Sequence, residues 1–194
     1  LKPLSRAEAD GDHIHGVIRA TTVNHGGRAN GYTVPDPDAH ATLISEALAR
    51  AGVEPGSLGY IEAHGTGTSL GDPIELSGLG KVFNGRTPPA WTCALGSVKS
   101  NIGHLEAAAG IAGLTKVLLQ FRHQRLVPSL HSQQLNPYID FTATPFRVQR
   151  ELSPWPVPRT SDGRPAPRRA GLRSFGAGVS NAHVILEEHL ASHP

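Results

Sequence analysis

The chain has 194 residues, of which 38% are hydrophobic and 18% charged, and its formal net charge is +2. This length supports one domain with a sizeable core, or part of a larger domain. The arginines within 164–173 have no aromatic residues among them, which argues against a nucleic-acid partner. No apolar run reaches the ~20 residues of a membrane-spanning helix. We therefore expect a cytoplasmic protein without a membrane partner.

The sequence holds a single cysteine, Cys93, and no methionine. One cysteine excludes an internal disulfide framework and fits a reducing compartment. Because translation begins at methionine, we expect the chain to be a piece of a longer polypeptide. The 22 glycines and 16 prolines predict many turns and close backbone contacts.

The first part of the chain predicts a strand, a loop, a helix and a second strand. Residues 14–23 are rich in β-branched side chains, which indicates a strand, and residues 24–38 form a loop of Gly, Asn and Pro. Apolar residues then recur at helical spacing over 37–51, and a glycine follows. The short apolar segment 59–63 predicts a strand that ends directly before His64.

The middle of the chain predicts a helix, a buried strand and a longer helix. Asp72 opens the first helix, which continues to about residue 83, and Glu75 can complete a capping box with it. Residues 92–98 predict a buried strand. Residues 105–122 predict a long helix whose first turns are nearly all Ala and Gly.

The tail differs in character. Residues 128–167 are rich in proline and predict irregular, wrapping structure. Two strands, 169–175 and 182–188, are then joined by a glycine-rich turn and predict a hairpin. Alternating strands and helices followed by a hairpin predict a layered α/β architecture.

Two histidine motifs stand out in this pattern. His64 lies in Glu-Ala-His-Gly-Thr-Gly-Thr at 62–68, and His104 ends Val-Lys-Ser-Asn-Ile-Gly-His at 98–104. Glycines admit a ligand close to the backbone, hydroxyls can bond an amide-bearing ligand, and a histidine titrates near pH 6.5. The alternative is a loop histidine that caps backbone groups. The flanking residues favour an active site with two imidazoles.

Lys99 follows a buried strand, where its charge needs a carboxylate or several acceptors. We nominate Glu75 as that carboxylate, with a capping role in its own helix as the alternative. Lys99 would then favour the neutral forms of the neighbouring imidazoles. Cys93 lies in an apolar strand and is predicted to be a core residue instead of a nucleophile. The remaining histidines lack a regular ligand spacing, so no metal site is predicted.

Three segments together resemble the signatures of the C-terminal half of β-ketoacyl synthases. They are EAHGTGTSLGDPIE at 62–75, GSVKSNIGH at 96–104 and RSFGAGVSNAH at 173–183. More narrowly, these segments resemble the ketosynthase domain of modular type I polyketide synthases. The loop VNHGGRANGYTVP at 23–35 resembles the variants that a free-standing acyltransferase serves.

The resemblance implies the C-terminal half of a thiolase-like layered α/β fold, in which two similar halves pack together and the complete domain forms a homodimer. Residues 1–150 would form this C-terminal half, and 151–194 would be its wrapping segment and closing β-hairpin. In such enzymes a cysteine takes an acyl chain from the phosphopantetheine arm of an acyl carrier protein. Two histidines promote decarboxylation of a malonyl thioester, and the carbanion attacks the acyl-cysteine.

Carried over by motif, His64 and His104 are the decarboxylating histidines, and Lys99 supports them. Phe175 would lie at the pocket as a gate, with its backbone N–H in the oxyanion hole. No cofactor is bound directly, because the pantetheine arm belongs to the carrier protein. The residues assigned to the substrate and its arm are Thr66, Thr68, Asn101 and Phe175.

The departure from the family concerns the nucleophile. The family's cysteine lies in a Cys-Ser-Ser turn of the N-terminal half, and Cys93 does not match it. We therefore expect an N-terminal half as a partner, with the acyl carrier protein. Two alternatives are a ketosynthase-like module that docks carrier proteins without condensation, and a non-elongating ketosynthase that only transfers acyl chains. The second commonly lacks the later histidine, which is present here as His104.

Overall fold

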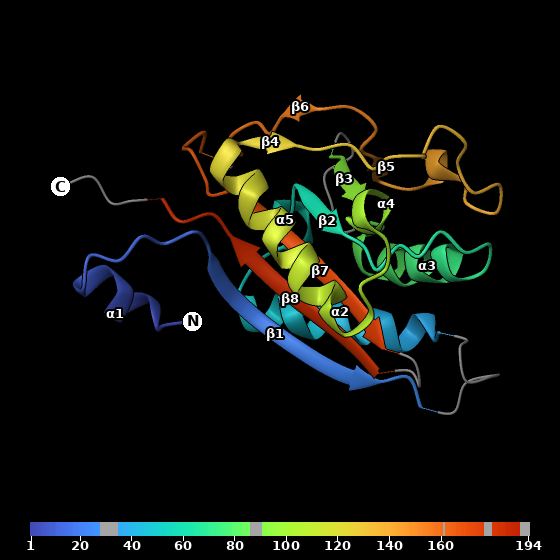
Figure 1. The fold of residues 1–194 in the computed structure, drawn as a ribbon, viewed down its shortest axis with the longest axis horizontal. Helices are drawn as coiled ribbons and strands as arrows, with labels where there is room; N and C mark the ends of the chain where they lie inside the picture. Colours follow the sequence, from blue (N-terminus) through green and yellow to red (C-terminus); the bar gives the residue numbers. More distant parts are fainter. Residues whose placement is uncertain (28–34, 86–90, 161, 177–179, 191–194) are drawn as a thin grey trace.

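A central six-stranded mixed sheet organises the chain, as Figure 1 shows for this computed structural model, which describes residues 1–27, 35–85, 91–160, 162–176 and 180–190. The strand order is β1-β8-β7-β2-β3-β5. Strand β2 runs parallel to β7 and β3, and β3 runs parallel to β5, whereas β8 is antiparallel to both β1 and β7. The strands are β1 Val17–His25, β2 Tyr60–Glu62, β3 Cys93–Gly96, β5 Phe146–Val148, β7 Arg169–Gly176 and β8 Ser180–Glu187.

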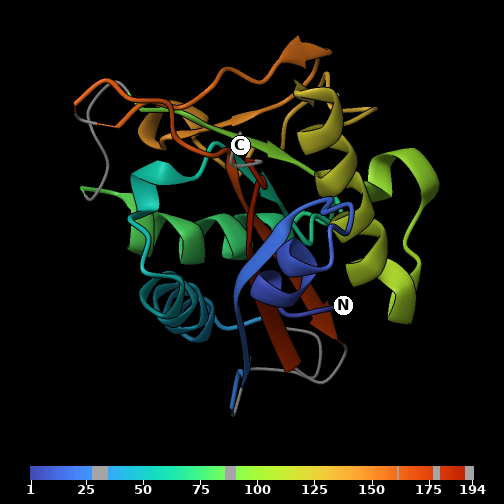
Figure 2. The same ribbon diagram turned by 90° about the vertical axis from the view of Figure 1, so that its left-hand side faces the viewer.

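Helices cover both faces of this sheet. Figure 2 shows α2 and α3 on one face and α5 on the other. A small second sheet pairs β4 with β6. The helices and short strands are α1 Leu4–Ala9, α2 Pro37–Ala51, α3 Gly71–Phe83, α4 Lys99–Ile102, α5 Ala109–His123, the 3-10 turns η1 Pro55–Ser57, η2 Glu106–Ala108 and η3 Phe141–Ala143, and β4 Arg125–Leu126 and β6 Ser153–Pro154. None of the described helices is long and apolar enough to cross a membrane.

Each face of the sheet has its own apolar core because side chains alternate along a strand. On the α2 and α3 side, Ile61 and Ile185 pack with Leu79 and Phe83. The other core packs strand residues beneath α5, and its buried members include Tyr60, Val117, Phe121, Trp155, Leu172 and Leu186. Strand β2 is therefore packed between two layers of helices.

The predicted helix at 37–51 is confirmed, and its ends follow from its flanking residues. Asp36 accepts a hydrogen bond from the Asp38 N–H at 2.9 Å, which caps the first turn. Gly52 ends the helix with a φ of 65°, a left-handed conformation that glycine adopts without strain.

The predicted capping box of the next helix is wrong. Helix α3 begins at Gly71, with no side-chain cap at its start. Asp72 instead accepts a hydrogen bond from the Gly67 N–H at 3.1 Å, and Glu75 accepts hydrogen bonds from the backbone of the His64 loop. The His64 loop lies against the start of α3, so its N–H groups donate to the carboxylates of Asp72 and Glu75.

Two further boundaries differ from the prediction. The helix expected at 105–122 is divided into η2 and α5, and Glu106 between His104 and α5 has a φ of 49°. The proline-rich tail contributes β5, which pairs with β3 and was not predicted from the sequence. The closing hairpin of β7 and β8 is confirmed, with 177–179 of its turn outside the described residues.

The close approach of α2 and α3 gives a test of this packing. A Cβ added at Gly78 would lie 2.7 Å from the His40 Cβ and 3.2 Å from the Pro37 carbonyl oxygen. We expect Gly78→Ala to lower the free energy of unfolding by about 1–3 kcal/mol through overpacking. Urea unfolding followed by tryptophan fluorescence measures this change.

Gly80→Ala in the same helix is the matched control. Its Cβ would meet only the end of the Asn84 side chain, at 3.3 Å. The gain in helix propensity should then raise stability by up to about 1 kcal/mol. Equal effects of the two substitutions would contradict the packing described.

Candidate functional site

The two histidine motifs meet at the carboxyl ends of the parallel strands β2 and β3, the usual ligand-binding edge of such sheets. The ring centroids of His64 and His104 lie 5.3 Å apart, and the rings are nearly perpendicular. Both rings line one cavity of about 1080 Å³. Its lining residues are Pro35, His64, Thr66, Thr68, Leu70, Gly71, Glu75, His104, Glu106, Ala107, Ser174, Phe175, Gly176 and Asn181.

Backbone hydrogen bonds determine which ring nitrogen faces the cavity as a donor. The Nδ1 atom of His64 accepts a hydrogen bond from the Phe175 N–H at 3.3 Å, and that of His104 accepts one from the Glu106 N–H at 2.9 Å. A neutral imidazole whose Nδ1 is an acceptor carries its proton on Nε2. Both histidines therefore offer an Nε2–H donor in their neutral forms.

Burial and neighbouring charges favour the neutral form of His64. Desolvation lowers its pKa to about 4, with a further contribution from the positive charge of Lys99. His104 and Arg173 also lower it, and the carboxylate of Glu75 opposes them. At neutral pH the His64 ring is a hydrogen-bond donor without a positive charge.

Glu75 lies beneath the His64 loop. Its two carboxylate oxygens accept hydrogen bonds from the N–H groups of His64 and Gly65, each at 2.9 Å. Burial alone would raise the pKa of Glu75, but Arg173 and these two N–H groups hold it below its ordinary value. The carboxylate therefore stays ionised and holds the loop in place.

The ion pair of Glu75 in this structure is with Arg173 at 3.4 Å, in place of the predicted pair with Lys99. The Arg173 side chain comes from β7 and also donates a hydrogen bond to the main-chain oxygen of Glu75 at 3.1 Å. Lys99 still responds to Glu75 at longer range. Desolvation lowers the pKa of Lys99, and the charge of Glu75 opposes that shift.

The residues predicted to contact the substrate separate into two groups. Thr66, Thr68 and Phe175 line the cavity with the histidines. Asn101 does not, because α4 carries it to a second cavity of about 630 Å³ between α4 and α5. Asn101 thus lies apart from the other residues assigned to the substrate, and its part in substrate binding stays a prediction.

Phe175 also differs from its predicted role. Its backbone N–H donates to the His64 ring, whereas the resemblance implied an N–H open to a substrate oxygen. Its own ring lies 5.0 Å from the His64 ring and stacks on the buried His40 at 4.2 Å. Phe175 thus orients the first histidine through both its backbone and its ring.

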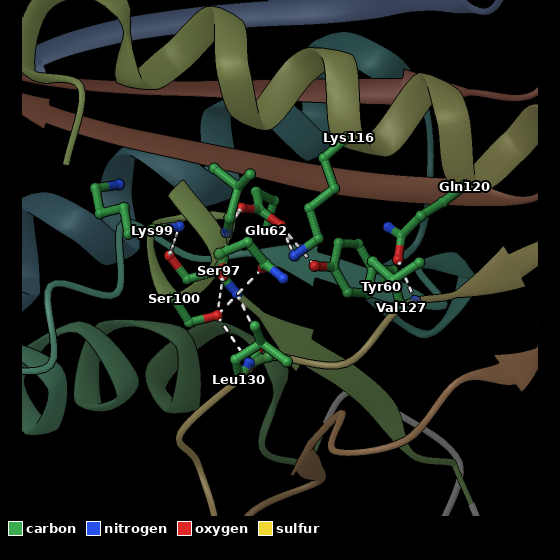
Figure 3. Close-up of polar contacts among 12 residues, drawn as sticks. Tyr60, Glu62, Ser97, Lys99, Ser100, Lys116, Gln120, Val127 and Leu130 are labelled. Atoms are coloured by element: carbon green, nitrogen blue, oxygen red, sulfur yellow. Dashed lines mark hydrogen bonds and ion pairs between the residues drawn. The ribbon is translucent and has the colours of Figure 1, made fainter. Parts of the chain in front are cut away.

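A second buried carboxylate, Glu62, joins the two motifs (Figure 3). Its Oε1 accepts a hydrogen bond from the Val98 N–H at 2.5 Å, at the start of the His104 motif. Its Oε2 accepts from the Tyr60 hydroxyl at 2.5 Å and pairs with Lys116 Nζ at 2.8 Å. The ends of β2 and β3 are therefore fixed to each other and to α5.

Serine hydroxyls hold the other side of the same turn. The Ser129 hydroxyl accepts a hydrogen bond from the Ser97 N–H at 3.1 Å. Ser100 donates to the Ser97 carbonyl at 2.9 Å and accepts from the Leu130 N–H at 3.0 Å. The segment that carries Lys99 and His104 is anchored on both sides, as Figure 3 shows for the serines.

Sequence reasoning missed the residues behind the site. Lys116 and Gln120 fall at helical spacing with Val117 and Phe121, so they occupy the buried face of α5. Arg173 likewise stands within a buried strand. A polar or charged residue on an otherwise apolar helix face or strand was the available signal for these positions.

Comparison with known proteins agrees with this geometry. Residues 15–133 match the family described as "Beta-ketoacyl synthase, C-terminal domain". The chain belongs to the β-ketoacyl synthase family. Two curated relatives are Bacillus subtilis (strain 168) polyketide synthase PksM, 59% identical over 98% of this chain, and Burkholderia thailandensis polyketide synthase ThaG, 61% identical over 97%. The chain spans only 4% of PksM and 3% of ThaG.

Solved ketosynthase structures confirm the predicted thiolase-like layered α/β fold. An oxazolomycin ketosynthase domain from Streptomyces albus JA3453, OzmH KS7, matches with a TM-score of 0.95 at 58% identity. The match covers 100% of this chain and 34% of that one. The module 6 ketosynthase of the Bacillus subtilis 168 bacillaene synthase, solved as a cysteine-to-serine mutant, matches with a TM-score of 0.91 at 46% identity, covering 98% and 33%.

The buried pair of Glu62 and Lys116 predicts a large asymmetry in stability. Lys116→Met leaves a carboxylate buried without its counter-charge, which should cost about 3–5 kcal/mol. The double variant Glu62→Gln, Lys116→Met should recover part of that loss because no charge remains. Lys81→Met, which removes an exposed ion pair with Asp38, is the control and should change little. Urea unfolding compares them, and equal losses in Lys116→Met and Lys81→Met would contradict the pairing.

The charge of Lys99 predicts the titration of His64. Because Lys99 lowers the His64 pKa, Lys99→Met should raise that pKa above about 4. The imidazole resonances of His64, followed by NMR as a function of pH, measure the shift. Lys81→Met again serves as the control and should leave the His64 pKa unchanged. An unchanged His64 pKa in Lys99→Met would refute the electrostatic coupling.

Proposed function

We propose that this chain supplies the decarboxylating part of a polyketide synthase ketosynthase, which joins an acyl-cysteine to a malonyl unit in chain elongation. One observation carries the proposal. His64 and His104 lie 5.3 Å apart in one cavity, and each has its Nδ1 occupied by a backbone N–H. Their Nε2–H groups are left to donate to a ligand.

The chemistry of decarboxylation suits two such donors. The bond between the malonyl α-carbon and its carboxylate breaks, carbon dioxide leaves, and the electron pair moves toward the thioester oxygen. Donors fixed in a cavity stabilise that developing charge better than mobile water. The α-carbon then attacks the acyl thioester on cysteine, and the cysteine thiolate leaves.

Cys93 is not a candidate for that nucleophile. It is fully buried in strand β3, and burial raises the pKa of its thiol well above the ordinary range. A thiol that stays protonated is a poor nucleophile. We assign the acyl-cysteine to an N-terminal half, on the same polypeptide or on a separate chain.

The surface of α5 supports a second half. Ile111 and Leu119 are exposed on this helix, at 60% and 47%, and the apolar cavity beside Asn101 adjoins it. The ketosynthase domains that match this chain are about three times longer than the region covered. Packing the remaining part of the domain over α5 would remove this apolar surface from water.

Thr66 and Thr68 are the residues we assign to the phosphopantetheine arm. Both line the cavity that holds the histidines. Their hydroxyls can donate to and accept from the amides of the arm. An acyl carrier protein would deliver the arm, and the complete domain would act as a homodimer. Gly65 before Thr66, and Gly67 between the two threonines, have left-handed backbone conformations.

We also retain the proposal that a free-standing acyltransferase serves this domain. It rests on the loop 23–35, of which 28–34 lie outside the described residues. The non-elongating alternative is less well supported, because both histidines lie in the cavity with donors toward it.

The test joins this chain to the segments of the oxazolomycin ketosynthase domain that it does not cover. The fusion is supplied with an acyl thioester and a malonyl-loaded carrier protein, and mass spectrometry follows the carrier-bound product. We expect an acyl-enzyme and an elongated chain. A folded fusion that binds the carrier but forms no elongated product would favour the docking-module alternative instead.

Removing the second histidine separates the two half-reactions. His104→Ala in the fusion should reduce malonyl decarboxylation on the order of 10²- to 10³-fold, as expected for the loss of one oxyanion donor. Acyl transfer to the cysteine should continue. The exposed His13 lies outside the cavity, so His13→Ala is the matched control. Unchanged elongation in His104→Ala would show that our role for this residue is wrong.

A further inference from the structure

Arg173 is the largest fully buried side chain that the structure describes, and beyond compensating the charge of Glu75 it has no assigned part in the reaction. It lies in the middle of β7, paired across the sheet with His183 of β8. Its side chain extends toward α3 on the face that carries the histidine cavity. An arginine at such a position requires an explanation, because burying a charge is costly unless it is well paired.

The pairing of Arg173 is incomplete. Its Nη1 donates to the main-chain oxygen of Glu75 at 3.1 Å and lies 3.4 Å from a Glu75 carboxylate oxygen. Its Nε and Nη2 atoms are buried without a hydrogen-bond partner. A guanidinium can donate five hydrogen bonds, so most of its capacity is unused. A well-packed apolar side chain would avoid this cost, and stability alone does not account for Arg173.

Two contacts connect Arg173 with His64. Through Glu75 it neutralises the carboxylate that accepts the N–H groups of His64 and Gly65. Its guanidinium also lies 4.8 Å from the ring centre of Phe175, whose N–H donates to the His64 ring. One side chain therefore touches both groups that fix the position and tautomer of this imidazole.

We infer that Arg173 is a positioning residue for His64, acting through the Glu75 carboxylate and the Phe175 ring. The inference rests on the proposed function, because it assigns Arg173 to the decarboxylation step. Arg173 does not contact the reacting atoms. Its loss should leave Glu75 without its counter-charge and Phe175 without one of its supports, so that the His64 donor is no longer held toward the thioester oxygen.

The surrounding charges favour this role. The buried His40 and His183 are neutral, with desolvation as the first cause, and their pKa values are lowered to about 4 and about 3. They neither compete with Glu75 for the guanidinium nor repel it as cations. Glu75 is thus the counter-charge of Arg173.

The experiment uses the full chain in the fusion described above, with the variants R173M, R173K and R168M. Arg168 is the matched control. It is also buried, and it pairs with Glu188 at 2.7 Å beyond the opposite end of β7. Acyl transfer, malonyl decarboxylation and the free energy of unfolding are measured for each variant. Two further variants, E75Q alone and E75Q with R173M, complete a double-mutant cycle that tests whether the two residues act together.

R173M should slow decarboxylation on the order of 10²-fold, the scale expected when a reacting group is displaced by about 1 Å. Acyl transfer should change much less. R173K keeps the charge but has no planar fork to span Glu75 and Phe175, so it should recover only part of the rate. R168M should lose stability without this selective loss. E75Q should itself slow decarboxylation, because a glutamine side chain can accept only one of the two loop N–H groups. If the two residues act together, the double variant should lose less than the sum of the losses in R173M and E75Q.

The titration of His64 provides a measurement that does not depend on elongation. The groups that face His64 are Glu75 from α3, Lys99 from α4, Arg173 from β7, and His104 and Glu106 across the cavity. Removing the positive charge of Arg173 should raise the His64 pKa, measured by NMR, and R168M should not.

The outcomes separate the two proposals. If the parent fusion fails to elongate, the proposed function is lost, and the His64 pKa alone then decides the role of Arg173. If the parent elongates but R173M loses no more decarboxylation than R168M, or the His64 pKa is the same in both, the inference is overturned. If R173M does not fold, R173K decides: decarboxylation at the parent rate would overturn the inference, and a selective loss of that rate would support it.

Discussion

The site depends on one interaction, the hydrogen bonding of a buried carboxylate to the backbone of the His64 loop. Glu75 accepts two N–H groups from that loop, and these bonds fix where the imidazole leaves the chain. The glycines of this loop have little conformational preference of their own. The carboxylate supplies the missing constraint, and it can remain ionised in the core because Arg173 compensates its charge.

The second motif is held by the same kind of interaction on the opposite face of the sheet. Glu62 accepts the Val98 N–H, and Lys116 compensates its charge from α5. Each histidine-bearing segment therefore donates backbone N–H groups to a buried carboxylate, and a buried cation compensates the charge of that carboxylate. Glu62 is also the last residue of β2, the strand that leads into the His64 loop. The ends of β2 and β3 thereby anchor the two segments that carry the imidazoles.

The sequence predicted the elements that depend on local patterns and missed those that depend on long-range contacts. Helix α2 was predicted closely because its apolar spacing and Gly52 are local signals. The capping box at Asp72 was a local rule as well, but the N–H groups of a distant loop competed for its carboxylates. Strand β5 was missed because its short segment is extended by pairing with β3. Of the residues assigned by motif, His64, His104, Thr66, Thr68 and Phe175 line one cavity, whereas Lys99 and Asn101 are not among its lining residues. The partner of Glu75 was mistaken because register across β7 cannot be read from spacing.

The hydrogen bonds that orient the two imidazoles explain why donors and nucleophile can be separate. Among the described residues, the backbone N–H groups of Phe175 and Glu106 donate to the two rings. The Glu75 carboxylate accepts the backbone N–H of His64. Donors fixed in this way need no rearrangement when charge develops on a thioester, which is the condition for electrostatic catalysis. A nucleophile has the opposite requirement, since it must be reached first by one thioester and then by the attacking carbanion. In the function proposed above, a thiol on a separate half would let the two imidazole donors stay rigid while the acyl group changes.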